Sequence, residues 1–249
     1  MSPYMILLGL VFLSCLLTAC HDSGHGIVIE GDLQGGGDQM IRLARIDSYE
    51  TVPLDSMRMR NGHFEFVLKA ATEEEKTLLA QSMLYRLSLT EDNGLTTMAR
   101  QGEDLHLVAE AANMIQTYRV TGGHEAMLIA SLDSALTVFV QKTQPLWKEY
   151  QQNMDDDAVR EKIETQYNAL VEQHTLFLHR FIQAHPTDMA SYVAFYQSYN
   201  KRSFLNERED FALLKKLTDN LSAQYPEHPY MLRMQQKIDF LQTQQYDTD

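Results

Sequence analysis

Nine histidines are the residues of this chain best suited to hold a metal ion. His174 and His179 are five residues apart, which places them on different faces of a helix, and no His-Glu-x-x-His motif occurs. His174 falls on a row of apolar residues at helical spacing, which predicts a partly buried packing residue. The Gly-x-Ser-x-Gly motif of many hydrolases is also missing, and no pair of carboxylates stands out in so acidic a chain. We therefore expect no metal site, no cofactor and no catalytic residue.

Two short runs resemble ligand-binding loops but have simpler interpretations. Gly35-Gly36-Gly37 could cradle a phosphate, yet a phosphate loop leads into a helix and an alternating strand pattern follows here. The run therefore predicts a turn. Asp155-Asp156-Asp157 lacks the glycine and the glutamate of a calcium loop, so it predicts the start of a helix, where negative charge is favourable.

An aromatic set could bind a ligand by stacking. Tyr192, Phe195, Tyr196 and Tyr199, with Trp147, have the ring surfaces on which sugars stack. Spacings of three and four residues are also those of the buried face of a helix, which is the favoured interpretation. The two alternatives differ in exposure, because a stacking surface requires Tyr192 and Tyr196 to be exposed. The sequence therefore leaves undecided whether the protein binds a glycan or peptide ligand.

The N-terminus predicts a secreted, lipid-modified protein. Met5 to Leu17 form an apolar run without charges, which is too short to span a bilayer and has the character of a signal peptide. The run ends in Leu17-Thr18-Ala19-Cys20, which resembles a bacterial lipobox. We expect residues 1–19 to be a signal peptide, Cys20 to be lipidated and residues 20–25 to form a tether. Several acyl chains, at about 0.8 kcal/mol per buried methylene, anchor a protein stably to a membrane.

The cysteine content then restricts the chemistry. The chain has 2 Cys, and Cys15 lies in the expected signal peptide. If Cys20 carries lipid, no free thiol follows it in this sequence. Residues after Cys20 would therefore form no disulfide, perform no thiol–disulfide exchange and bind no metal through thiolate.

Two different periodicities divide the rest of the chain. Between residues 26 and 123, apolar residues alternate in short runs separated by turn residues, which predicts an antiparallel β-sandwich or barrel. Expected strands are Gly26–Gly31, Met40–Ile46, Thr51–Met59, His63–Leu68, Leu84–Thr90, Thr96–Arg100, Asp104–Val108 and Thr117–Thr121. Asn61-Gly62 predicts a tight hairpin turn, since both residues tolerate positive φ.

From His124 to Asp249 the period is helical and predicts an all-α domain of about five helices. The first should kink or end near Pro145, and the second has a seam at Ile163, Tyr167, Leu170, His174, Phe177 and Phe181. These two should pack as an antiparallel hairpin. Asn206 and Glu209 have capping-box spacing and predict the start of the fourth helix. The fold class is therefore α+β.

Composition excludes one class of partner. The chain has 249 residues, a net charge of −13, 44% hydrophobic and 22% charged residues, which is a globular balance. The negative charge is spread over both halves, so neither has a cationic face for nucleic acid, and we expect no binding to DNA or RNA.

Several segments together resemble one family. Gly26-Ile27-Val28-Ile29-Glu30-Gly31-Asp32-Leu33, Ile41-Arg42-Leu43, Leu54-Asp55-Ser56-Met57 and Asn61-Gly62-His63-Phe64-Glu65-Phe66 are similar to the N-terminal β domain of unknown function of Bacteroidetes-type lipoproteins. Gly102 to Leu107, Val120 to Gly123 and Phe181 to Tyr196 match its later strands and helical spacer. In that family a membrane-tethered thioredoxin-like oxidoreductase domain usually follows. This sequence has no Cys-x-x-Cys, so the resemblance does not imply the redox activity.

These observations predict a non-catalytic, lipid-anchored protein of the cell envelope that acts as a binding or scaffold module for an envelope protein partner. The alternative, implied by the resemblance, is an accessory docking subunit of a periplasmic thiol–disulfide redox system whose catalytic subunit is another chain. A third and weaker hypothesis, an enzyme, requires a polar cleft between the two halves lined by carboxylates with shifted pKa values. His21 to Gly24 hold one acidic residue, fewer than a surface-export signal has, which favours the outer membrane facing the periplasm.

Overall fold

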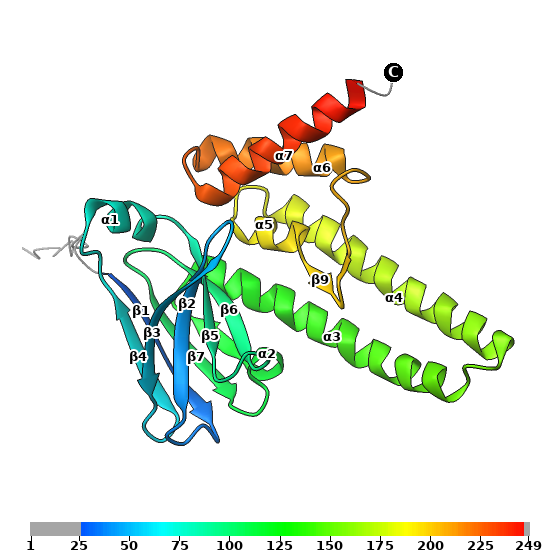
Figure 1. The fold of residues 1–249 in the computed structure, drawn as a ribbon, viewed down its shortest axis with the longest axis horizontal. Helices are drawn as coiled ribbons and strands as arrows, with labels where there is room; N and C mark the ends of the chain where they lie inside the picture. The colour runs from blue at the N-terminus through cyan, green and yellow to red at the C-terminus, as the bar shows by residue number, and fades with distance from the viewer. Residues whose placement is uncertain (1–25, 247–249) are drawn as a thin grey trace, which may run out of the picture.

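The computed structural model describes residues 26–246 and confirms the α+β class. Two four-stranded sheets come first in the chain, and five helices follow from His124 onward (Figure 1). The predicted signal peptide, Cys20 and the tether at residues 20–25 lie outside the described residues.

The first sheet contains one parallel pair, which differs from the all-antiparallel expectation. Its strand order is β4 (His63–Leu68), β1 (Ile27–Gln34), β7 (Asp104–Glu110) and β8 (Arg119–Thr121). β1 pairs antiparallel with β4 but parallel with β7. The chain between β1 and β7 passes through the second sheet before it returns, so no hairpin sets the direction of this pair.

The second sheet is antiparallel throughout. Its order is β3 (Thr51–Arg58), β2 (Met40–Ile46), β5 (Met83–Ser88) and β6 (Gly94–Ala99). The pairing of β2 with β3 shifts register between Leu43 and Ala44, which marks a bulge.

Alternate residues of the strands build the core of the β part. β1, β4 and β7 place every second side chain inside, as in Ile27 and Ile29 of β1 or Phe64 and Phe66 of β4, all at most 1% exposed. Burial of each such side chain contributes roughly 1.5–3 kcal/mol. The alternation read from the sequence therefore corresponds to the buried faces of the two sheets.

Glycines form the two predicted turns. Asn61 and Gly62 have φ values of 54° and 87°, as a tight two-residue hairpin turn requires. Gly35 and Gly37 also have positive φ, of 77° and 53°, in the turn between β1 and β2. The turn interpretation of the glycine run is confirmed, because a strand and not a helix follows it.

Two short helices within the β part were not expected from the sequence. α1 (Glu73–Leu79) connects β4 to β5 and starts with a capping box between Thr72 and Glu75. α2 (Met114–Thr117) occupies the start of the segment predicted as the strand Thr117–Thr121, so β8 begins two residues later, at Arg119.

α3 (His124–Gln152) and α4 (Asp157–Ala184) form the predicted antiparallel hairpin, which extends away from the sheets (Figure 1). Ile163, His174 and Phe181 of the predicted seam are buried. Asp156 caps α4 by accepting hydrogen bonds from the N–H groups of Ala158 and Val159, each at 3.1 Å, which confirms the helix-start interpretation.

The expectation that α3 kinks or ends at Pro145 was partly wrong, because the helix continues for seven residues to Gln152. Pro145 removes one backbone donor, but its side is exposed, so water can reach the carbonyl left free in the preceding turn. In the turns that follow, Glu149 pairs with Lys162 of α4 at 3.8 Å.

The last three helices pack beside the sheets and α4. They are α5 (Ala190–Phe195), α6 (Phe211–Gln224) and α7 (Pro229–Tyr246), and a short hairpin of β9 (Ser198–Tyr199) and β10 (Arg202–Ser203) lies between α5 and α6. The predicted cap at Asn206 is misplaced, since α6 starts at Phe211. The Asn206 side chain instead accepts from the N–H groups of Arg208 and Glu209 and closes a turn just before the helix.

The β and helical parts share one continuous hydrophobic cluster. Tyr230 of α7, 1% exposed, joins them: its hydroxyl donates to the carbonyl of Ile46 on β2 and accepts from the N–H of Leu84 on β5 at 3.1 Å. This contact sets the position of α7 relative to the second sheet.

Candidate functional site

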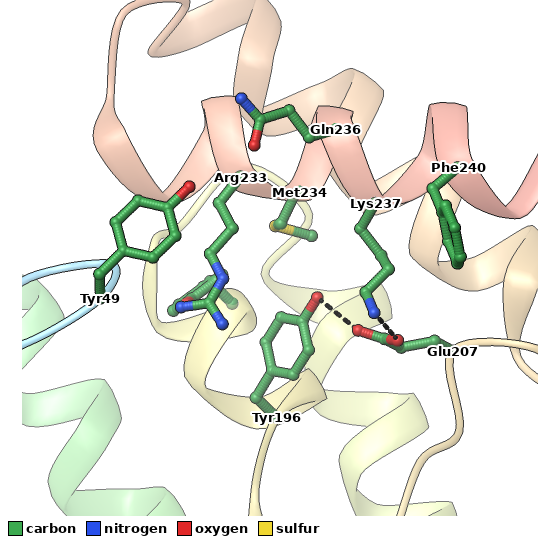
Figure 2. A pocket seen from close by; sticks show the side chains of 9 residues that line it. Tyr49, Tyr196, Glu207, Arg233, Met234, Gln236, Lys237 and Phe240 are labelled. Carbon is green, nitrogen blue, oxygen red and sulfur yellow. Dashed lines mark hydrogen bonds and ion pairs between the residues drawn. The ribbon is translucent and has the colours of Figure 1, made fainter.

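A pocket of about 550 Å³ lies where the β part meets α5 and α7 (Figure 2). We name it the junction pocket. Its size falls within the range of ligand sites. The residues that line it come from the β2–β3 loop, α5 and its C-terminal end, the loop before α6, and α7: Tyr49, Tyr192, Tyr196, Glu207, Arg233, Met234, Gln236, Lys237 and Phe240.

Helical spacing brings the α7 side chains into one wall. Arg233, Lys237 and Phe240 follow one another at intervals of four and three residues, so they share a face of α7. Met231 and Ile238 lie on the buried side of the same helix. Burial of these two residues fixes the rotation of α7 about its axis, and this rotation directs Arg233 and Lys237 toward the pocket.

The facing wall is aromatic and rests on the sheet. Tyr192 and Tyr196 are four residues apart, with ring centroids 5.1 Å apart. Tyr192 stacks on Tyr230, with centroids 4.9 Å apart and the rings 8° from parallel. Because the Tyr230 hydroxyl is bonded to the second sheet, this wall is held in place by buried groups rather than by a loop.

One acidic side chain organises the far end of the pocket. Glu207 accepts a hydrogen bond from the Tyr196 hydroxyl at 3.3 Å and pairs with the Lys237 ammonium at 3.0 Å. Figure 2 shows both interactions. Burial, and then the negative charge of Glu207, raise the pKa of Tyr196, so this phenol stays a neutral hydrogen-bond donor.

Arg233 has a different environment. Its guanidinium carbon lies 5.2 Å from the centre of the Tyr49 ring, and the side chain extends between Tyr49 and Tyr196 (Figure 2). Within residues 26–246 Arg233 forms no ion pair, although the whole chain carries a net charge of −13. An arginine held between aromatic rings and free of a carboxylate can bind an external anion through two parallel hydrogen bonds.

The structure divides the aromatic set identified in the sequence. Phe195 is 1% exposed and belongs to the core, which the buried-face interpretation predicts. Tyr192 is half-buried and Tyr196 is 37% exposed, and both line the junction pocket. Tyr199 and Trp147 line a separate cavity. The set is therefore neither one stacking surface nor one buried face.

Sequence reasoning missed the charged residues of the pocket. Tyr49, Glu207, Arg233 and Lys237 come from three distant segments, and their individual patterns are those of ordinary surface residues. A weak signal was present in α7, where Arg233 and Lys237 stand four residues apart on the face next to the apolar row.

The two histidines of α4, His174 and His179, both contact other side chains of the protein. His174 is 6% exposed, and its Nε2 lies 2.7 Å from Oε1 of Gln197, while burial lowers its pKa. This confirms the predicted packing role. His179 pairs with Asp210 at 3.3 Å. No group of three or more potential metal-binding side chains is found among residues 26–246.

Several carboxyl groups with raised pKa are engaged in packing and do not face the junction pocket. Glu125, 7% exposed, accepts from the N–H groups of Met189 and Ala190, both at 2.8 Å, at the start of α5, and burial raises its pKa. Burial also raises the pKa of Asp133 to about 6, while a hydrogen bond from the Tyr118 hydroxyl opposes that shift. Both groups lie on α3, and their hydrogen bonds connect that helix to the start of α5 and to the residue between α2 and β8.

Comparison with known proteins finds no matching family, no matching curated protein and no matching solved structure. Among the helices of the described range, none is both long enough and apolar enough to span a membrane. The lipid anchor predicted at Cys20 lies outside that range.

Proposed function

We propose that this chain is a non-catalytic binding protein of the cell envelope, anchored to the outer membrane by lipid on Cys20. Its binding site is the junction pocket, and its ligand carries a carboxylate. The leader and the Leu17-Thr18-Ala19-Cys20 run support the anchor. The observation that carries the binding role is Arg233, a cation placed between tyrosine rings without a counter-ion in the described chain.

The chemistry of the pocket supports a carboxylate ligand with a flat or apolar body. Arg233 provides the planar donor pair that matches a carboxylate, and Lys237 adds a second positive charge that Glu207 partly neutralises. Tyr49 and Phe240, 81% and 52% exposed, offer ring surface for the rest of the ligand. An acidic sugar and the C-terminus of a peptide both have this chemistry.

The test compares matched pairs of probes by isothermal titration calorimetry. The first pair is an oligogalacturonate and its neutral methyl ester. The second pair is a tripeptide with a free C-terminus and the same tripeptide with an amidated C-terminus. We expect the free acids of one pair to bind and their neutral counterparts to bind at least about tenfold more weakly, because a charged hydrogen-bonded pair contributes roughly 1.5–3 kcal/mol. Which pair responds identifies the source of the carboxylate.

Variants then assign the effect to the pocket. Arg233→Gln should remove the preference for the free acid, whereas Arg180→Gln, on the exposed face of α4 and outside the pocket, should not. Equal binding of acids and neutral forms, or an equal effect of both variants, would contradict the proposal. The anchor is tested separately by mass spectrometry of the N-terminal peptide, where an unmodified Cys20 would overturn it. Recovery of a thioredoxin-like protein with the purified chain would favour the docking-subunit alternative instead.

A further inference from the structure

A second cavity, of about 520 Å³, lies between the distal parts of α3 and α4 and the β9–β10 hairpin. We name it the hairpin cavity. It shares no residue with the junction pocket, and its volume is that of a small-molecule site rather than of a flat protein interface. Four aromatic rings line it: Trp147, Tyr150, Tyr167 and Tyr199.

Trp147 is an unusually exposed aromatic residue. It is 62% exposed, and its ring lies 7° from parallel with that of Tyr150, with centroids 5.8 Å apart. Both residues are on α3, three positions apart, so the helix fixes their relation. An indole left in water at the mouth of a cavity has apolar ring surface still to be covered.

The polar residues of the cavity have unused hydrogen-bonding capacity. Gln144, Glu164, Asn168 and Asn200 line it, and their side chains form no hydrogen bond or ion pair with any other residue of the described chain. The guanidinium of Arg202 lies 5.6 Å from the centre of the Tyr167 ring and pairs with no carboxylate in that range. Together these side chains provide amide, carboxylate and guanidinium groups, which include both donors and acceptors of hydrogen bonds.

A strained turn places two of these groups. Asn200 and Lys201 have φ values of 49° and 64° in the turn that connects Tyr199 with its partner Arg202. Positive φ is unfavourable for a lysine and is maintained where the surrounding structure requires it. Asn200 and Arg202 therefore line the cavity together with side chains of α3 and α4.

From this arrangement we propose that the hairpin cavity binds a neutral oligosaccharide, with one pyranose ring stacked on Trp147 and its hydroxyl groups bonded to the surrounding amides, Glu164 and Arg202. A sugar ring has an apolar C–H face that packs on an aromatic ring and an edge of hydroxyls that both donate and accept. Glu164 and Arg202 balance in charge, which distinguishes this cavity from the junction pocket, where Arg233 and Lys237 exceed Glu207. The inference does not depend on the carboxylate site.

Trp147 is the single tryptophan of the sequence, so tryptophan emission of the full chain reports on this cavity. The full chain is purified in a detergent without a sugar head group and titrated with trisaccharides of the malto, cello, xylo, manno and chito series. We expect at least one series to change the emission in a saturable way. No saturable change with any series would overturn the proposal, as would an emission change that follows protein concentration without sugar, which would indicate contact between two copies.

Variants separate binding from folding. With calorimetry as the readout, Trp147→Ala and Asn168→Ala should each weaken binding of the responding sugar at least about tenfold. Gln166→Ala, exposed on α4 outside the cavity, should bind as the parent chain does. Arg233→Gln should also leave sugar binding unchanged. A refutation of the sugar site can therefore be distinguished from a refutation of the carboxylate site in the junction pocket. Unchanged affinity of the Trp147→Ala chain would refute the stacking arrangement.

Discussion

Two buried tyrosines allow the same substitution to be tested with opposite expected results. Tyr230 and Tyr85 are 1% and 0% exposed. The Tyr230 hydroxyl donates to the Ile46 carbonyl and accepts from the Leu84 N–H at 3.1 Å. The Tyr85 hydroxyl is buried without a hydrogen-bond partner among the described residues. Replacement by phenylalanine removes one oxygen at each site and leaves the rings, so only the hydrogen bonding differs.

Tyr230→Phe leaves a backbone donor and a backbone acceptor unsatisfied in the interior. Each such group costs about 1–3 kcal/mol, so we expect the free energy of unfolding to fall by about 2–6 kcal/mol. With a urea m-value of roughly 1–3 kcal/mol per molar, the unfolding midpoint should fall by about 0.7 M or more. Tyr85→Phe removes a hydroxyl whose burial is not compensated, so the same free energy should stay unchanged or rise by up to about 2 kcal/mol.

Urea unfolding followed by circular dichroism measures both variants under one condition. The m-values should stay equal to that of the parent chain, since neither change alters the surface buried on folding. A loss below about 0.5 kcal/mol for Tyr230→Phe, or an equal loss for both variants, would refute the assignment of the Tyr230 hydroxyl as the link between α7 and the second sheet.

Two further predictions concern a buried carboxyl and a glycine. Burial raises the pKa of Asp133 from 3.8 to about 6, so the folded chain loses about 3 kcal/mol of stability relative to the unfolded chain as the pH rises from about 4 to 6. Asp133→Asn keeps an acceptor for the Tyr118 hydroxyl and has no carboxyl group to ionise, so it lacks this loss. In urea unfolding, the free energy of unfolding of the variant relative to the parent chain should therefore be higher at pH 7 than at pH 4. The same difference between variant and parent at both pH values would contradict the raised pKa of Asp133. Gly122 has φ 98°, and an added Cβ would lie 1.8 Å from the Asp104 carbonyl oxygen, so Gly122→Ala should destabilise by more than about 2 kcal/mol. Gly35→Ala, at φ 77° with open space around it, should cost about 1 kcal/mol, and equal midpoint shifts for the two would exclude the clash.

Local patterns predicted most elements because each depends on near neighbours in sequence. Strand alternation and helical spacing follow from the need to bury one face, so Met40–Ile46, His63–Leu68 and the α4 seam were found directly. α1 was missed although Thr72 and Glu75 have capping-box spacing, because the segment between them and β5 has too few apolar residues to show a helical row.

Contacts between distant segments were not predictable in the same way. The parallel pairing of β1 with β7 joins strands about seventy residues apart and has no turn signal. The junction pocket likewise combines Tyr49, Glu207 and Arg233 from three separate segments. Their proximity depends on how α7 packs on the second sheet, which the Tyr230 hydroxyl decides through two backbone groups that carry no side-chain pattern.

The sequence by itself therefore determined the α+β class, the turns at Asn61-Gly62 and Gly35 to Gly37, and the expectation of a lipid anchor at Cys20, because these follow from spacing within short stretches of chain. Only the tertiary structure decided which aromatic residues are core and which face a cavity. Tyr192, Phe195 and Tyr196 share one helical pattern, and their different exposure results from what packs on each of them: Tyr230 on the first, the core on the second, and the open junction pocket beside the third.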